Sequence, residues 1–254
     1  MFGINSKFNV QLSKFFFDRT FLHSGARGDI VLSLPAIKML GGGVLFIEAT
    51  GVYCVFGGKP ISLQEIQHFK EVFIKCDYIK DVLPYKKEIV NYNLNRFRLE
   101  KNLTTTHLTK SHCNAFNVKF DLNQPWLNKN DYNKKFLNNI IINHTMRYEG
   151  LITNWSDLKE FEKHITFIGH EFEYTNFIKK TKLNIQYYKV KSFLEIVEIL
   201  NACSLYIGNQ SFIYTFAEAM KIPRILSICP YAPSCPPTYN TSSILSKEIV
   251  SKFI

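Results

Sequence analysis

The stretch HSGARGDIVLSLPAIKMLGGG, residues 23–43, decides the fold. An apolar run at residues 20–24 leads into it and predicts a strand that ends in the small-residue loop 25–29. Apolar residues then recur at helical spacing until the three glycines at 41–43, and a second apolar run follows at 44–47. Strand, helix and strand in this order predict a βαβ unit with parallel strands.

Pro35 refines where this helix begins. Because proline has no N–H to donate, it fits best in the first turn of a helix. We therefore expect the helix proper to begin near Leu32, which leaves Gly28 and Asp29 in the loop or at the very start of the helix.

A polar stretch, PWLNKNDYNKK at residues 125–135, has the composition of a linker. Before it we expect a helix at 63–76 and extended segments at 78–83 and 88–92. After it we expect strands at 140–143, 165–168, 185–188, 205–207 and 225–228, and helices at 155–163, 171–180, 193–200, 212–220 and 238–254. Ser192 and Glu195 form a capping-box pattern at one helix start. The alternation predicts an α/β fold with two Rossmann-like domains, residues 1–130 and 131–254, that face each other across a cleft.

The chain is basic, with 31 Lys and Arg against 21 Asp and Glu and a formal net charge of +10. Nucleic acid, a membrane surface or a phosphorylated substrate would each suit such a charge. The lysines are scattered and form no long basic run, so we favour a compositional bias as the explanation. We expect no nucleic-acid partner and at most peripheral membrane association.

Six cysteines lie far apart, without a C-x-x-C pair or a spacing typical of zinc sites. We therefore expect reduced thiols and a cytoplasmic location. Charged residues interrupt the first 20 positions, so we expect neither a signal peptide nor a spanning helix there.

Two loops have the design of ligand sites in open α/β sheets, where ligands bind at the carboxyl ends of strands and helix N-termini attract anions. One loop is residues 24–29, and the other is residues 208–211. Helix capping alone also explains the polar side chains of both loops.

The segments that contain the two loops, in this order along the chain, resemble those of a known family. HSGARGDIVLSLPAIKMLGGG resembles the opening segment of the heptosyltransferase-like family 9 of bacterial glycosyltransferases, and CSLYIGNQSFIYTFAEAMKIPRI, residues 203–225, resembles the second nucleotide-binding segment of that family. Supporting pieces are YNLNRFR at 92–98, IIINHTMRYEG at 140–150 and FIGHEFEY at 167–174. The resemblance spans nearly the whole chain.

The resemblance implies a GT-B fold and an enzyme that moves a sugar, with inversion, from a nucleotide sugar to an acceptor hydroxyl. The partners would be a nucleotide sugar and a glycan or other hydroxyl acceptor, with no cofactor and no metal. The sequence contains no D-x-D pair that would hold a divalent ion. A role in bacterial or phage surface glycan synthesis is the expected setting.

Asp29 is implied as the general base, and a helix N-cap is the competing structural explanation. Arg147 is implied as a donor to the diphosphate, and a surface or interdomain ion pair explains it equally well. The remaining donor-side candidates are Gly208, Asn209, Gln210, Ser211, Phe212 and Glu218, and the acceptor-side candidates are Gly25, Arg27 and Gly28. Glu218 is also explained by a solvated helix face.

The second segment departs from the pattern of the family. The family has an acidic residue, a small hydroxyl residue, glycine and later histidine where this chain has Gln210, Ser211, Phe212 and Thr215. Phenylalanine in place of glycine is expected to narrow the room for a diphosphate, and Gln210 removes a charge. The donor would then differ from ADP-heptose, or the chain would be a catalytically silent nucleotide- or sugar-binding module of the same fold.

Overall fold

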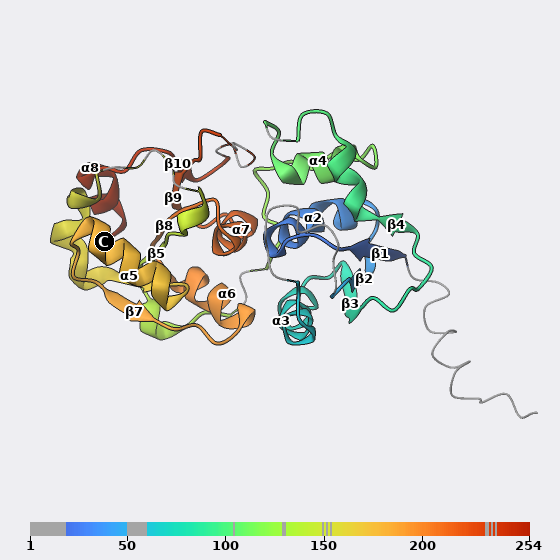
Figure 1. The fold of residues 1–254 in the computed structure, drawn as a ribbon, viewed down its shortest axis with the longest axis horizontal. Coiled ribbons are helices and arrows are strands. Elements are labelled where there is room, and N and C mark those ends of the chain that lie inside the picture. The colour runs from blue at the N-terminus through green and yellow to red at the C-terminus, as the bar shows by residue number, and fades with distance from the viewer. Residues whose placement is uncertain are drawn as a thin grey trace, which may run out of the picture.

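The computed structural model describes residues 19–49, 60–103, 105–128, 131–148, 150, 152, 154–231, 234, 236 and 238–254. In these ranges the chain forms two parallel sheets with helices, which lie side by side in Figure 1. The predicted α/β fold is confirmed. Most of residues 1–20, residue 130 at the expected domain boundary, Cys54 and Cys235 lie outside the described residues.

The first sheet has the strand order β3-β2-β1-β4. Its strands are β1 Thr20–His23, β2 Gly43–Ile47, β3 Ile79–Pro84 and β4 Tyr92–Asn93, and all pair in parallel. Its helices are α2 Arg27–Met39, α3 Leu63–Phe73 and α4 Leu108–Asn114, with the 3-10 helix η1 at Leu94–Leu99. The extended segment expected at 88–92 is a strand only from Tyr92 onward.

Helix α2 begins earlier than predicted, because Pro35 lies in its interior and not in its first turn. A proline inside a helix leaves the carbonyl four residues earlier without its usual N–H partner. Here that carbonyl belongs to Val31, and it accepts a hydrogen bond from the indole Nε1 of Trp126 at 3.2 Å. A side chain distant in sequence thus satisfies the group that the proline leaves open, and Gly28 and Asp29 fall in the first turn.

The second sheet has the order β10-β9-β8-β5-β6-β7, and all of its pairings are parallel. Its strands are β5 Ile140–Asn143, β6 Ile165–Ile168, β7 Gln186–Tyr188, β8 Leu205–Asn209, β9 Arg224–Ser227 and β10 Thr241–Ser242. Its helices are α5 Glu171–Thr181, α6 Phe193–Ala202, α7 Phe212–Ala219 and α8 Lys247–Val250. The 3-10 helices are η2 Lys134–Phe136, η3 Met146–Tyr148, η4 Trp155–His164 and η5 Ser251–Phe253.

Three expectations for this half need correction. The helix expected near residue 155 is a 3-10 helix, and the single helix expected at 238–254 is replaced by a short strand and two short helical turns. Only half of the predicted capping box forms: Ser192 accepts from the Glu195 N–H at 3.1 Å. The Glu195 carboxylate instead accepts from Lys191 N at 2.6 Å and from the Tyr188 hydroxyl at 2.7 Å.

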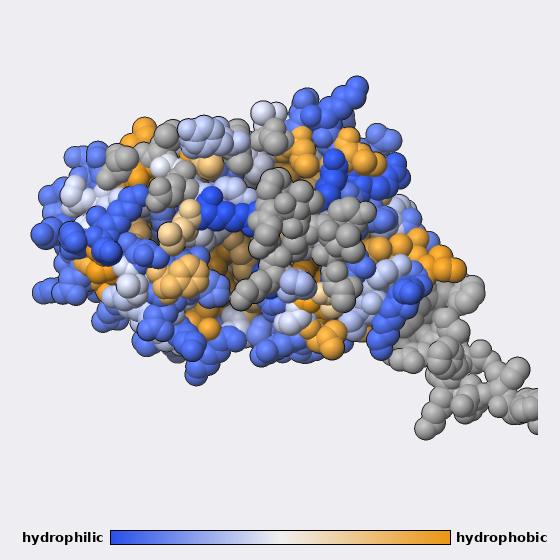
Figure 2. All heavy atoms as spheres, in the orientation of Figure 1, coloured by the Kyte–Doolittle hydropathy of each residue, from blue (hydrophilic) through white to orange (hydrophobic). Residues whose placement is uncertain are grey.

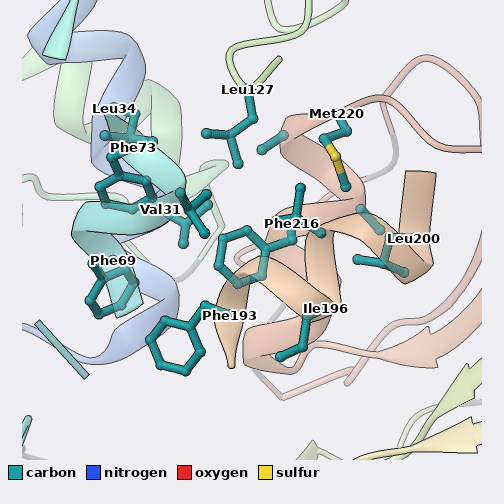
Figure 3. Packing of buried hydrophobic residues seen from close by; sticks show 14 of the residues in the cluster. Val31, Leu34, Phe69, Phe73, Leu127, Phe193, Ile196, Leu200, Phe216 and Met220 are labelled. Carbon is teal, nitrogen blue, oxygen red and sulfur yellow. The ribbon is translucent and has the colours of Figure 1, made fainter. Parts of the chain in front are cut away.

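One hydrophobic core joins the two halves. Buried residues of α2 and α3 pack in the same cluster as those of α6 and α7. In Figure 3, Phe216 of α7 lies between the side chains of Phe69 and Phe73 on one side and those of α6 on the other. Trp126, from the predicted linker, is buried there as well, and its backbone N–H donates to Ala219 O at 2.9 Å. The linker is therefore packed against both halves.

Three further features of the molecule are its surface hydropathy, its helix lengths and its cysteines. On the face shown in Figure 2, hydrophilic residues predominate and hydrophobic ones form small separate patches. No helix among the described residues is long and apolar enough to cross a bilayer. The four described cysteines, Cys76, Cys113, Cys203 and Cys229, are buried and free.

Candidate functional site

Each sheet has one point where the strand order reverses. In the first sheet this point lies between β1 and β4, and in the second between β5 and β8. Ligands of open α/β sheets bind outside the carboxyl ends of the strands at such points, because the connections leave in opposite directions and open a space there. The loops after these four strands are therefore where functional side chains are expected.

Asp29 and Arg98 meet at the first of these points. Asp29 follows β1 in the first turn of α2, and Arg98 follows β4 in η1. Their side chains pair at 3.4 Å, with about a fifth of each exposed (23% and 20%). Burial raises the pKa of Asp29, while the charges of Arg98 and Arg147 and a hydrogen bond from the Ala26 backbone oppose that rise. A carboxyl with a raised pKa in a strand-end loop suits a general base.

Gly25 allows this pair to come close. A Cβ at Gly25 would lie 2.6 Å from Nη2 of Arg98 and 3.1 Å from Oδ2 of Asp29. Any larger residue would have to separate the two charged groups. Asn95 holds Arg98 from the other side, because its Oδ1 accepts from Nη1 of Arg98 at 3.0 Å and from Ser24 N at 3.0 Å.

Two neutral histidines lie next to the pair. The rings of His23 and His112 are 5.3 Å apart and fully buried, and the His112 ring lies 3.9 Å from the Phe97 ring at an angle of 33°. Burial and the charge of Arg98 together lower the pKa of His23 well below its usual value and that of His112 to about 3. His23 Nδ1 accepts from Gly25 N at 2.9 Å, so this ring also orders the loop.

The loops of the two halves meet. A Cβ at Gly28 would lie 3.2 Å from the Thr215 methyl group of α7. Arg147, exposed in η3 after β5, is close enough to Asp29 for its charge to lower the pKa of that carboxyl. The helices that follow the two loops, α2 and α7, therefore pack together at the junction between the sheets.

The side chains of the second loop bond mainly within the protein. The side chain of Asn209 is fully buried and bonds to the turn that carries Arg147. Ser211 caps α7 by accepting from Tyr214 N at 3.2 Å, and its hydroxyl donates to Asn143 Oδ1 at 2.6 Å. Gly208 packs so closely on Tyr206 and the Asn143 carbonyl that no Cβ would fit.

Gln210 and Phe212, two of the departures from the family pattern, also make internal contacts. Gln210 Oε1 accepts from Cys229 N at 2.7 Å, which ties this loop to the segment after β9. The Phe212 ring lies 4.7 Å from Phe193, 4.9 Å from Phe216 and 5.9 Å from Phe69 of α3. The ring therefore points into the core between the halves, which leaves the backbone N–H of Phe212 at the start of α7.

Arg27 and Glu218 are both held in ion pairs. Arg27 pairs with Glu65 through two bonds of 2.5 and 2.8 Å, and Glu65 also completes the capping box of α3. Glu218 is fully buried, not solvated, and it bonds to Lys221 and Arg224. Burial alone would raise the pKa of Glu218, but Arg224, Lys221 and His107 hold it below its usual value. These contacts leave Glu218 no oxygen exposed to a ligand.

In the part of the chain that the structure describes, no group of three His, Cys, Asp or Glu side chains is placed to hold a metal ion. Positive charge near the junction comes instead from Arg98 and Arg147. Helix α7 adds the partial positive charge of its N-terminus.

Comparisons with solved structures agree with this architecture, although no family model and no curated protein matches the sequence. A glycosyltransferase family 9 protein of Veillonella parvula is 13% identical with a TM-score of 0.53, over 93% of this chain and 96% of the other. The E. coli heptosyltransferase WaaC with ADP is 10% identical with a TM-score of 0.58, over 92% and 98%. TibC of enterotoxigenic E. coli is 17% identical with a TM-score of 0.52, over 91% of this chain and 64% of TibC. The chain has the GT-B fold of these proteins.

Within this GT-B fold, the sequence pointed to Asp29 and Arg147, and the structure places both at the junction of the domains. Arg98 was missed as a site residue. The signal that could have found it is its place in the segment 92–98, just after a short strand of the first sheet. The assignment of individual site residues to catalysis or donor binding stays a prediction.

Proposed function

We propose that this chain is a glycosyltransferase that moves a sugar from a nucleotide-activated donor to an acceptor hydroxyl, with inversion and without a metal. One observation carries the proposal: Asp29 lies at the start of α2, where α2 meets α7 of the other half, within reach of the charge of Arg147. Burial there raises the pKa of its carboxyl. Solved structures of the same fold are heptosyltransferases that hold ADP or ADP-heptose. We expect the acceptor to belong to a surface glycan and the protein to act in the cytoplasm.

In the proposed reaction, Asp29 takes the proton from the acceptor hydroxyl while the acceptor oxygen forms a bond to the anomeric carbon. The bond from that carbon to the donor phosphate breaks, and its electron pair leaves with the nucleoside diphosphate. Arg147 and the backbone N–H groups at the start of α7 would stabilise the departing charge. Attack and departure on opposite faces of the sugar give inversion.

A catalytically silent module is the second candidate function. It is favoured by the internal bonds of Gln210 and Ser211, which leave few side chains of the second loop for a donor. Such a module would bind a nucleotide or a sugar through Arg147 and the helix start, and it would transfer nothing.

The two candidates are separated by measuring binding and turnover on the same proteins. Thermal unfolding is followed with ADP-, GDP-, UDP-, CMP- and dTDP-linked sugars, since a ligand at about 100 times its Kd stabilises the native state by about 2.7 kcal/mol. The best donor is then incubated with an acceptor panel, and nucleotide release is compared for the wild type and Asp29→Asn. The enzyme predicts equal stabilisation of both proteins by the donor but release by the wild type alone. Equal slow release by both proteins supports the silent module, and no stabilisation by any donor refutes both candidates.

A further inference from the structure

Asn209 is the last residue of β8, and its side chain crosses to the turn that follows the neighbouring strand β5. Its Nδ2 donates to Thr145 O at 2.6 Å and to Tyr148 O at 2.8 Å. Its Oδ1 accepts from Thr145 N at 3.0 Å and lies 3.4 Å from Thr145 Oγ1. The amide thus bonds to the backbone on both sides of Arg147.

We propose that Asn209 is a positioning residue that fixes Arg147 for the diphosphate of the donor and does not itself contact the donor. The inference rests on the proposed function of Arg147. Both N–H groups of the amide are already donated to carbonyls, and the side chain is fully buried. An asparagine amide has two N–H donors, so none is left for a phosphate oxygen.

The turn needs such support because it is short. Helix η3 covers only Met146–Tyr148, a single 3-10 turn with poor internal hydrogen bonding. Arg147 is exposed, and its guanidinium lies 4.9 Å from the ring centroid of Tyr148, the residue whose carbonyl accepts from Asn209. A long charged side chain binds a diphosphate well only when the backbone that carries it is held in place, because ordering that segment on binding costs affinity. Two bonds to carbonyls before and after Arg147 supply that order before the ligand arrives.

Residue size alone does not explain asparagine at this position. A buried polar side chain is tolerated only where it finds hydrogen-bond partners. An apolar residue at the end of β8 would fill the same space and would need no such partners. The carbonyls of Thr145 and Tyr148 would then lose their donor. A carboxylate could not donate to them either, so asparagine is the residue type whose donors and acceptor fit this turn.

A double-mutant cycle with inorganic pyrophosphate as the probe tests the inference. The dissociation constant is measured by titration calorimetry at low salt for the wild type, Asn209→Leu, Arg147→Ala and the double variant. Asn209→Leu keeps the branching and the number of heavy atoms and removes the polar atoms, and the smaller Asn209→Ala serves as a second variant if the first fails to fold. Asn139→Leu is the matched control, because this half-buried amide lies at the opposite end of β5.

The expected result is a loss of about tenfold for Asn209→Leu, comparable to the loss of one charge-assisted hydrogen bond. In the Arg147→Ala background the same substitution should change the affinity less than twofold, because there is no guanidinium left to position. Asn139→Leu should bind as the wild type does.

Wild-type affinity in both folded Asn209 variants would overturn the positioning role and leave the function of Arg147 intact. Losses that multiply in the double variant would also overturn it, since Asn209 would then act independently of Arg147. If Arg147→Ala binds pyrophosphate as tightly as the wild type, or if the wild type does not bind it, the proposed donor site itself fails and this inference fails with it.

Discussion

Removing the charge of Arg98 should raise the pKa of Asp29 further. The substitution Arg98→Met keeps most of the side-chain length and deletes the guanidinium that lies 3.4 Å from Asp29 Oδ2. Two unit charges at this distance attract by roughly 1 kcal/mol at the dielectric constant of water and by roughly 5 kcal/mol at an effective value of about 20. Both side chains are about a fifth exposed, so the true value lies between these limits. One pH unit corresponds to about 1.4 kcal/mol, so we expect a rise of about one to three units.

The assay is a pH titration by carbon NMR of protein labelled at the aspartate carboxyl groups, with the Asp29 signal identified by its loss in Asp29→Asn. Arg98 also lowers the pKa values of His23 and His112, so the imidazole signals should titrate at higher pH in the same variant. The matched control is Arg96→Met, because Arg96 lies two residues away over the Phe116 ring at 5.6 Å. An Asp29 pKa that is unchanged or lower in Arg98→Met, or an equal rise in Arg96→Met, would refute the assigned cause.

Three further predictions concern stability. Folding raises the pKa of Asp29, so its ionised form destabilises the native state above the folded pKa and the penalty vanishes below the unfolded value of about 4. Asp29→Asn should therefore increase the free energy of unfolding in urea at about pH 7 but not at about pH 3, and an equal change at both would contradict the shift. Phe69→Ala should lower that free energy by about 3–5 kcal/mol. Trp126 lies in the same core as Phe69, and Trp155 lies in the core of the other sheet. The fluorescence transitions of both tryptophans should shift to the same lower urea midpoint. A Trp155 transition that stays in place would mean that the halves unfold separately. Glu218→Gln should cost about 3–5 kcal/mol by calorimetric unfolding, because two buried cations lose their anion, and a near-neutral effect would argue against the ion pairs.

The sequence predicted most of the longer strands, because they are short apolar runs bounded by polar or small residues. It placed β4 too early and missed β10, since these two-residue strands carry no apolar run. It failed where a distant side chain decides the local structure. Pro35 indicated a helix start, but Trp126 satisfies the carbonyl of Val31 and allows the proline inside α2. No pattern within a short window can report a partner 95 positions away.

The candidate site shows the same limit. Glycines and a carboxylate after a strand marked the loop of Asp29, since those residue types have direct geometric consequences. The sequence could not predict the direction in which a side chain points. Phe212 was expected to narrow the donor site, yet its ring packs against Phe69 and Phe193 in the core. The place of Arg98 just after a short strand was a weak signal, because the importance of Arg98 comes from the pairing of β1 with β4, which brings it to Asp29.

Helix α7 links these observations. Its first residue, Phe212, packs on α3, Thr215 faces Gly28 of α2, and Glu218 lies 3.8 Å from His107 at the start of α4. The same helix presents its N-terminus beside the turn of Arg147, whose support, Asn209, ends the preceding strand. Because closely packed cores resist continuous deformation, the contacts of α7 with three helices of the first sheet fix the spacing between Asp29 and the loops of the second sheet. The phenylalanine at the start of α7, where the family pattern has glycine, thus acts on the joint between the two halves.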